Sequence, residues 1–147
     1  MVGSNVGSRN GAKALRTQGR SENELSALVV EEAMRLHRGL GPGLLENVYE
    51  TILAKKLEER GVSVRKQVQV PLIYEGIASD AAFRADIVAD DKLILEIKAV
   101  EKLNNAHRKQ VLTYLKLTGM RLGMILNFSS ELMKHGIVRV ANELDDD

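Results

Sequence analysis

The sequence predicts an α/β fold in which a mixed β-sheet is covered by helices. Near the start of the chain, apolar residues recur at intervals of three and four, which indicates helices packed on a core. From Val62 the apolar residues follow the shorter period of extended chain, and one helical segment then separates these strands from the last ones. This order, roughly α-α-β-β-β-β-α-β-β, fits helices on a mixed sheet better than an all-α or an all-β design.

Two helices are expected before the sheet. Ser21 and Glu24 form a capping-box pattern, in which each side chain can bond the other's backbone N–H, so the first helix should begin there. The glycines and Pro42 between residues 39 and 43 cannot comfortably continue it. A second helix should then run to about Arg60, where a glycine follows as a natural stop.

Strands and one further helix fill the rest of the expected domain, residues 21–142. Asp90 and Asp91 have the side chains of a hairpin turn and should join two of the strands. The expected elements are extended chain over residues 62–73, strands over 83–89 and 93–99, a helix over about 105–117, a buried strand over 122–128 and a short strand over 137–140.

Composition excludes several classes of site. The 147 residues suit one ordinary domain, and 44% hydrophobic residues are enough for a core. The chain has no cysteine, so a disulfide framework, a thiolate zinc site and a cysteine nucleophile are all excluded. Any metal must be held by oxygen or histidine ligands. No apolar run approaches the roughly 20 residues that cross a bilayer, and we therefore expect a cytoplasmic protein without membrane contact.

The formal net charge of +1 conceals two ends of opposite sign. Residues 1–20 contain four basic side chains and no acidic one, whereas the chain ends in three aspartates. Basic residues among Gly, Ser and Asn could touch phosphates, but such a segment is more often a solvated, disordered tail. We therefore expect a flexible basic segment over residues 1–20 and an acidic tail over residues 143–147.

The stretch between Asp86 and Lys98 is the most informative for chemistry. Side chains alternate across a strand, so Glu96 and Lys98 share one face. A turn at residues 90 and 91 brings Asp86 roughly opposite Glu96, although a change of one residue in the loop would alter the register. Two carboxylates and one ammonium group would then converge.

Such a group of side chains suits hydrolysis of a phosphodiester. Crowded carboxylates repel each other unless a cation lies between them, and Mg²⁺ prefers oxygen ligands that water and substrate phosphate complete. The ion would stabilise charge on the phosphate, while Lys98 could orient water or neutralise the phosphate. The alternative is an ordinary strand whose polar face, including Glu96, is simply solvated.

Two helices could add polar side chains to the same site. Glu46 lies at the start of the second helix, where it either points at a metal or only favours the positive end of the helix dipole. In the third helix His107 and Gln110 share a face. Gln110 could bond a phosphate, a water or a metal-bound carboxylate, whereas a surface or packing role is the preferred interpretation of His107.

Together these residues resemble the GxxExxY family, which is placed within the PD-(D/E)XK nuclease superfamily. The resemblance spans about Glu24 to Val140, and it rests on the order and spacing of several motifs, none of which is specific alone. The motifs are Gly43-x-x-Glu46-x-x-Tyr49, Arg84-x-Asp86, Glu96-x-Lys98 and Gln110-x-x-x-Tyr114.

The resemblance implies a restriction-endonuclease-like core and a metal site. Asp86 and Glu96 would be metal ligands, the backbone carbonyl of Ile97 would be a further ligand, and Glu46 would be the acid contributed by a helix. The implied cofactor is Mg²⁺, for which Mn²⁺ can substitute. The leading proline of the superfamily motif is replaced here by Ala85.

The same resemblance gives the other roles and the partners. Lys98 would face water or phosphate, and Gln110 would be the polar residue of the helix after the hairpin. The expected function is hydrolysis of nucleic acid, with DNA favoured. Related nucleases often work as dimers, so a homodimer is expected. A non-catalytic nucleic-acid-binding module and a protein-interaction module stay open as alternatives. The basic residues that a binding module would use are Arg65, Lys66, Lys102, Arg108 and Lys109.

Overall fold

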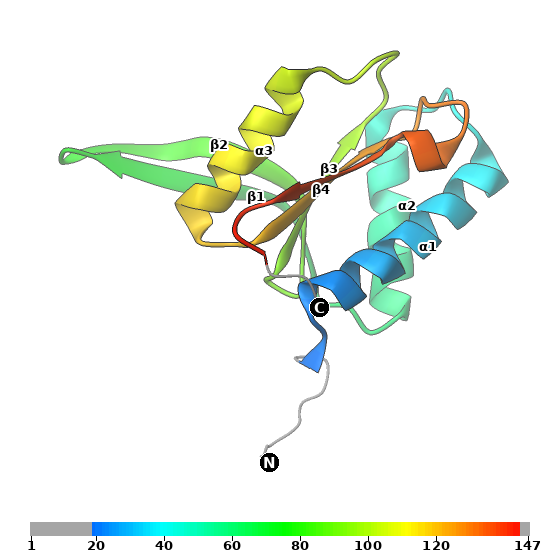
Figure 1. Cartoon of the computed structure of the whole chain (residues 1–147), viewed down its shortest axis with the longest axis horizontal. Helices are drawn as coiled ribbons and strands as arrows, with labels where there is room; N and C mark the ends of the chain where they lie inside the picture. Colours follow the sequence, from blue (N-terminus) through cyan, green and yellow to red (C-terminus); the bar gives the residue numbers. More distant parts are fainter. Residues whose placement is uncertain (1–18, 145–147) are drawn as a thin grey trace.

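The computed structural model describes residues 19–144, and it has a five-stranded sheet with helices on both faces (Figure 1). Residues 1–18 of the expected basic segment and residues 145–147 of the expected acidic tail lie outside this description. In chain order the elements are α1 (Glu22–Leu40), α2 (Glu46–Glu59), β1 (Val64–Tyr74), β2 (Ile77–Ala89), β3 (Leu93–Lys98), α3 (Asn105–Thr118), β4 (Leu122–Asn127), the short 3-10 helix η2 (Met133–His135) and β5 (Ile137–Ala141).

The strands lie side by side in sequence order, β1-β2-β3-β4-β5. β3 and β4 run parallel and are joined through α3, whereas the other neighbours are antiparallel. The predicted α/β class with a mixed sheet is therefore confirmed. The expected order contained four strands before α3, and this was wrong by one: the extended chain expected from residue 62 forms the single strand β1, and residues 77–82 join the strand expected over 83–89 to form the single strand β2.

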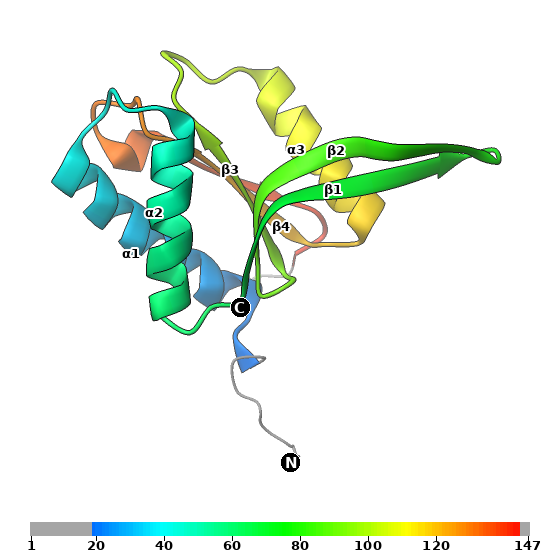
Figure 2. The same ribbon diagram turned by 180° about the vertical axis from the view of Figure 1, so that it is seen from behind.

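Two apolar cores lie on opposite faces of the sheet, beneath the helices that Figures 1 and 2 show on either side of it. α1 and α2 cover one face, where Leu53 of α2 and Leu95 of β3 belong to the same fully buried cluster. α3 covers the other face, where Val111 packs with Ile94 and Ile125. Because residues alternate across β3, Leu95 and Ile97 face the first core and leave Glu96 on the α3 side.

Two local predictions that position the site are confirmed. The capping box at the start of α1 is present, with both reciprocal bonds between Ser21 and Glu24. Asp90 and Asp91 form the turn between β2 and β3 with positive φ angles of 51° and 52°. Asp90 also accepts a hydrogen bond from the N–H of Ser63 at 2.8 Å, so this acid has the structural role that the turn predicted.

The turn also ties the start of the described chain to the sheet. Arg20, the last residue of the expected basic segment, lies 3.4 Å from Asp90 and donates to the carbonyl of Arg60 at 2.9 Å. Arg20 and the backbone of Ser63 therefore both hold Asp90, at the turn end of the hairpin that carries Asp86. Between residues 19 and 144, none of the helices combines the length and the apolar character that crossing a membrane requires.

Candidate functional site

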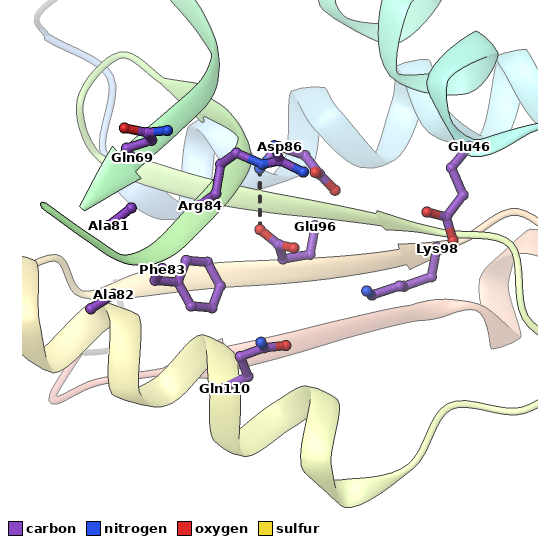
Figure 3. A pocket seen from close by; sticks show the side chains of 10 residues that line it. All are labelled: Glu46, Gln69, Ala81, Ala82, Phe83, Arg84, Asp86, Glu96, Lys98 and Gln110. Atoms are coloured by element: carbon purple, nitrogen blue, oxygen red, sulfur yellow. Dashed lines mark hydrogen bonds between the residues drawn. The ribbon is translucent and has the colours of Figure 1, made fainter. Parts of the chain in front are cut away.

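An open pocket of about 530 Å³ lies between α3 and the strands β1 to β3, with α2 at one end. α3 runs along one side of it and β2 along the other (Figure 3). The five side chains predicted from the sequence as catalytic all line this pocket, although they come from four elements. The lining residues are Glu46, Gln69, Ala81, Ala82, Phe83, Arg84, Asp86, Glu96, Lys98 and Gln110.

Asp86 and Glu96 lie where β2 and β3 separate. The backbones of the two strands pair as far as Ile87 and Leu95. Beyond this pair, the carboxylates of Asp86 and Glu96 accept hydrogen bonds from backbone N–H groups of the opposite strand. The N–H of Asp86 donates to Oε2 of Glu96 at 3.2 Å (Figure 3), and the N–H of Ile97 donates to Oδ2 of Asp86 at 2.8 Å. The hairpin register therefore brings these two carboxylates together, as the sequence predicted.

The carboxyl group of Glu96 is in an unfavourable place for a negative charge. Its side chain is 7% exposed, and burial, followed by the charge of Asp86, raises its pKa to about 8. The charge of Lys98 and a backbone hydrogen bond from Asp86 lower this pKa, but they do not offset the larger effects. A cation beside Asp86 and Glu96 would offset the cost of burying the negative charge and would reduce the repulsion between the two carboxylates.

Lys98 and Gln110 complete the centre of the pocket. Lys98 is the last residue of β3, is half-buried and extends into the pocket on the same side of the strand as Glu96 (Figure 3). Gln110 is exposed on α3 and faces the strands across the pocket (Figure 3). An ammonium group and an amide group are thus available to an anion that lies over the two carboxylates.

Glu46 reaches the pocket from α2. Its Oε2 accepts a hydrogen bond from the N–H of Ala99 at 2.9 Å, directly after the end of β3. Tyr49 determines where this helix begins, because its buried ring stacks on Phe128 at 4.4 Å and its hydroxyl donates to the carbonyl of Gly41 at 2.6 Å. The tyrosine of the Gly-x-x-Glu-x-x-Tyr pattern is therefore structural, and it places the glutamate.

Glu50 and Gln67 were not predicted as site residues, although Gln67 contacts Asp86 and Glu50 contacts Gln67. The amide of Gln67 donates to both carboxylate oxygens of Glu50, at 2.8 and 3.0 Å, and to Oδ1 of Asp86 at 3.4 Å. Gln67 has a φ of 52°, and the pairing of β1 with β2 skips it. The spacing of Glu50, four residues after Glu46, was the available signal, since it places both acids on one side of α2.

The hairpin of β1 and β2 also supplies pocket residues that were not predicted. Arg84 lies two residues before Asp86 on the same strand, so alternation alone would have placed both side chains on one face. Phe83 packs edge-on against Tyr114 of α3, with ring centroids 4.5 Å apart, and fixes the hairpin on the helix. This contact closes the side of the pocket opposite Glu46.

His107 has the structural role that the sequence analysis preferred. It is the third residue of α3 and forms a capping box with Asn104, whose N–H donates to Nδ1 of His107 at 3.3 Å. The backbone N–H of His107 donates back to the side chain of Asn104 at the same distance. The ring therefore caps a helix, outside the pocket lining.

The donor set fits a divalent cation that takes few protein ligands. Among residues 19–144, no three Asp, Glu or His side chains come together as a metal-binding group. Asp86 and Glu96 are a close pair, whereas Glu46 is turned to Ala99. Two carboxylates suit Mg²⁺, which usually keeps several waters and binds through one or two carboxylates and substrate phosphate.

A family model identifies the superfamily of this chain, and a solved structure shares its fold. A family model described as the PD-(D/E)XK nuclease superfamily matches residues 23–140, which include every lining residue of the pocket. The crystal structure of SSO0001 is similar with a TM-score of 0.55 and 18% identity, over 84% of this chain and 62% of that one. This chain thus spans less than two thirds of SSO0001, and the likeness concerns the fold alone. No curated protein matches the chain.

Proposed function

Because this chain belongs to the PD-(D/E)XK nuclease superfamily, we propose that it is a metal-dependent nuclease that hydrolyses phosphodiester bonds, with DNA as the favoured substrate. The observation that supports this most is the arrangement of Asp86, Glu96 and Lys98 around one open pocket beside the end of β3. Within the superfamily, the order of its motifs favours the GxxExxY family. A cytoplasmic homodimer is the corresponding proposal for its assembly and location.

Asp86 and Glu96 would hold the cation, Mg²⁺ or Mn²⁺, together with the backbone carbonyl of Ile97. The N–H of Ile97 already fixes the carboxylate of Asp86, so the two strands present their acids in a set arrangement. Glu46, at the end of the pocket, is the further acid of this site. The bound ion supplies Lewis-acid stabilisation of negative charge on the phosphate.

The remaining polar side chains would act on the phosphate directly. Lys98 extends into the pocket beside Glu96, where its ammonium group can neutralise a phosphate oxygen or orient the attacking water. Gln110 can donate its amide to a second oxygen from the opposite side of the pocket. Gln67 contacts Asp86, and Glu50 of α2 holds the amide of Gln67, so both act as positioning residues.

Replacing Asp86 with Asn tests this proposal. We expect the wild-type chain to cut single-stranded or double-stranded DNA or RNA when Mg²⁺ or Mn²⁺ is present, and not after chelation. Asp86→Asn should lower the single-turnover rate about 100-fold or more, because the neutral amide is a poor ligand for a divalent cation. The measurement is cleavage of end-labelled oligonucleotides under excess enzyme.

Asp91→Asn is the matched control. Asp91 is an exposed acid of the same hairpin, lies outside the pocket and pairs with the exposed Arg65, so its replacement should leave the rate unchanged. Equal rates for Asp86→Asn and the wild type would contradict the assignment. Salt-dependent binding without any turnover by the wild type would favour the binding module instead.

A further inference from the structure

The hairpin of β1 and β2 continues past the body of the sheet as a two-stranded arm (Figures 1 and 2). We define the arm as residues 69–84, which pair from Gln69 with Arg84 out to Tyr74 with Ile77. A register shift between Val70 and Leu72 lies within it. Phe83 holds the base of the arm on α3, whereas the outer half extends away from the sheet.

The arm ends in three exposed apolar side chains, which we call the tip. Ile73, Tyr74 and Ile77 are 72%, 66% and 74% exposed, and Tyr74 pairs directly with Ile77 across the hairpin. Apolar groups this exposed are unfavourable in water unless they are covered in use. Three side chains are nevertheless far short of the roughly 800 Å² per partner that a stable protein interface buries.

The arm is continuous with the candidate site. Half of the residues that line the pocket belong to it, because β1 and β2 run from the pocket directly out to the tip. A strand of nucleic acid whose phosphate lies over Asp86 and Glu96 therefore meets the arm as it leaves the pocket. Arg84 lies at the inner end of the arm and lines the pocket, where its guanidinium can contact the next phosphate.

Charge then decides what the outer arm can contact. Residues 67–83 contain no Lys or Arg, and the acids Glu75 and Asp80 lie at or near the tip. Phosphates would be repelled there, so electrostatic contact ends at Arg84. Apolar and aromatic side chains can still contact the faces of bases, which carry no net charge.

We propose that the tip packs against an unpaired base of the strand that occupies the pocket, with the ring of Tyr74 stacked on the base and Ile73 and Ile77 beside it. This inference rests on the proposed function and narrows its substrate class. The substrate would have a single-stranded segment beyond the cleaved bond, because bases within a duplex do not expose their faces.

Binding measured against salt tests the inference. We expect Tyr74→Ser to weaken binding of a single-stranded oligonucleotide about 5- to 150-fold, the range for loss of one base–aromatic stack, while Tyr74→Phe binds as the wild type does. The slope of log affinity against log salt should be unchanged in Tyr74→Ser, whereas Arg84→Ala should reduce it by about 0.7. Binding of a blunt duplex should be insensitive to Tyr74→Ser.

Leu132→Ser is the matched control, since Leu132 is 53% exposed and lies outside the arm and the pocket lining. The Leu132→Ser protein should bind the single strand with the same affinity as the wild type. Wild-type affinity in Tyr74→Ser would overturn the inference, and so would a loss that is equal for duplex and single strand. If light scattering shows that Tyr74→Ser separates a dimer into monomers, the tip is a self-association surface and the inference is also overturned.

These outcomes are distinct from failure of the proposed nuclease. Binding requires no turnover. If the wild type never cuts nucleic acid but Tyr74→Ser weakens its binding of a single strand, base stacking at the tip is supported and the nuclease proposal is contradicted. Conversely, cleavage that depends on Asp86, together with a single-strand affinity that Tyr74→Ser leaves unchanged, would support the nuclease and contradict base stacking at the tip.

Discussion

Glu96→Gln is expected to abolish cleavage and, in metal-free buffer at alkaline pH, to make the protein more stable. The side chain is buried beside Asp86, and its pKa is about 8 in the folded chain against an ordinary value of 4.5. Between these two values the folded state keeps a proton that the unfolded state releases. The free energy of unfolding of the wild type therefore falls as pH rises from about 4.5 to about 8. Above pH 8 the stability that came from the bound proton of Glu96 is lost.

Glutamine has no proton to lose, so this part of the pH dependence should disappear in the variant. At about pH 5 the two proteins should be of similar stability, and at about pH 9 the variant should be more stable by a few kcal/mol. Urea unfolding of both proteins in EDTA at the two pH values measures the difference. A stability difference that does not change with pH would mean that Glu96 is not desolvated in the folded chain.

The same substitution separates stability from activity. Cleavage by Glu96→Gln should be lost even where the protein is more stable, because the amide cannot replace a carboxylate as a ligand of a hard cation. A gain in stability together with a loss of activity is expected at a functional site, because residues there are selected for chemistry even where they destabilise the fold.

Lys98→Ala is expected to lower the single-turnover rate about 100- to 1000-fold, the usual cost of removing one electrostatic contact to a reacting group. Lys98 extends into the pocket from the strand that carries Glu96, so its ammonium group would act on the phosphate that undergoes attack. The fold should persist, because the side chain is half-buried and is not part of either apolar core.

The control for Lys98 is a lysine of equal charge outside the pocket. Lys102 is exposed in the segment after β3, and Lys102→Ala should change only the salt-dependent affinity. Lys98→Arg keeps the charge but not the compact shape of the ammonium group, and it should restore only part of the rate. If Lys98→Ala and Lys102→Ala reduce cleavage equally, and only at subsaturating substrate, Lys98 contributes binding and not catalysis.

The contacts that could be predicted from the sequence are those between residues close along the chain. Asp86 and Glu96 come together because a short turn of three residues, which begins with Asp90 and Asp91, fixes the register of one hairpin. The capping box at Ser21 is likewise readable, since its members are three residues apart. Such contacts depend on backbone geometry that few residues determine.

The contacts that escaped prediction depend on how distant elements pack. Glu50 meets Gln67 only because α2 lies against β1, and Gln67 turns toward the acids through a φ that no periodicity reveals. Glu46 bonds Ala99 across 53 positions of sequence. The arm was also missed in part, because residues 78–82 are small or polar and lack the apolar alternation that predicts a strand.

Calorimetric titration of Mn²⁺ tests most directly whether Asp86 and Glu96 hold a divalent cation together. We expect saturable binding to the wild type and to Asp91→Asn, and binding weakened by about 100-fold or more in Asp86→Asn. Identical titrations of the wild type and Asp86→Asn, or no binding by the wild type even with nucleic acid present, would contradict the metal site.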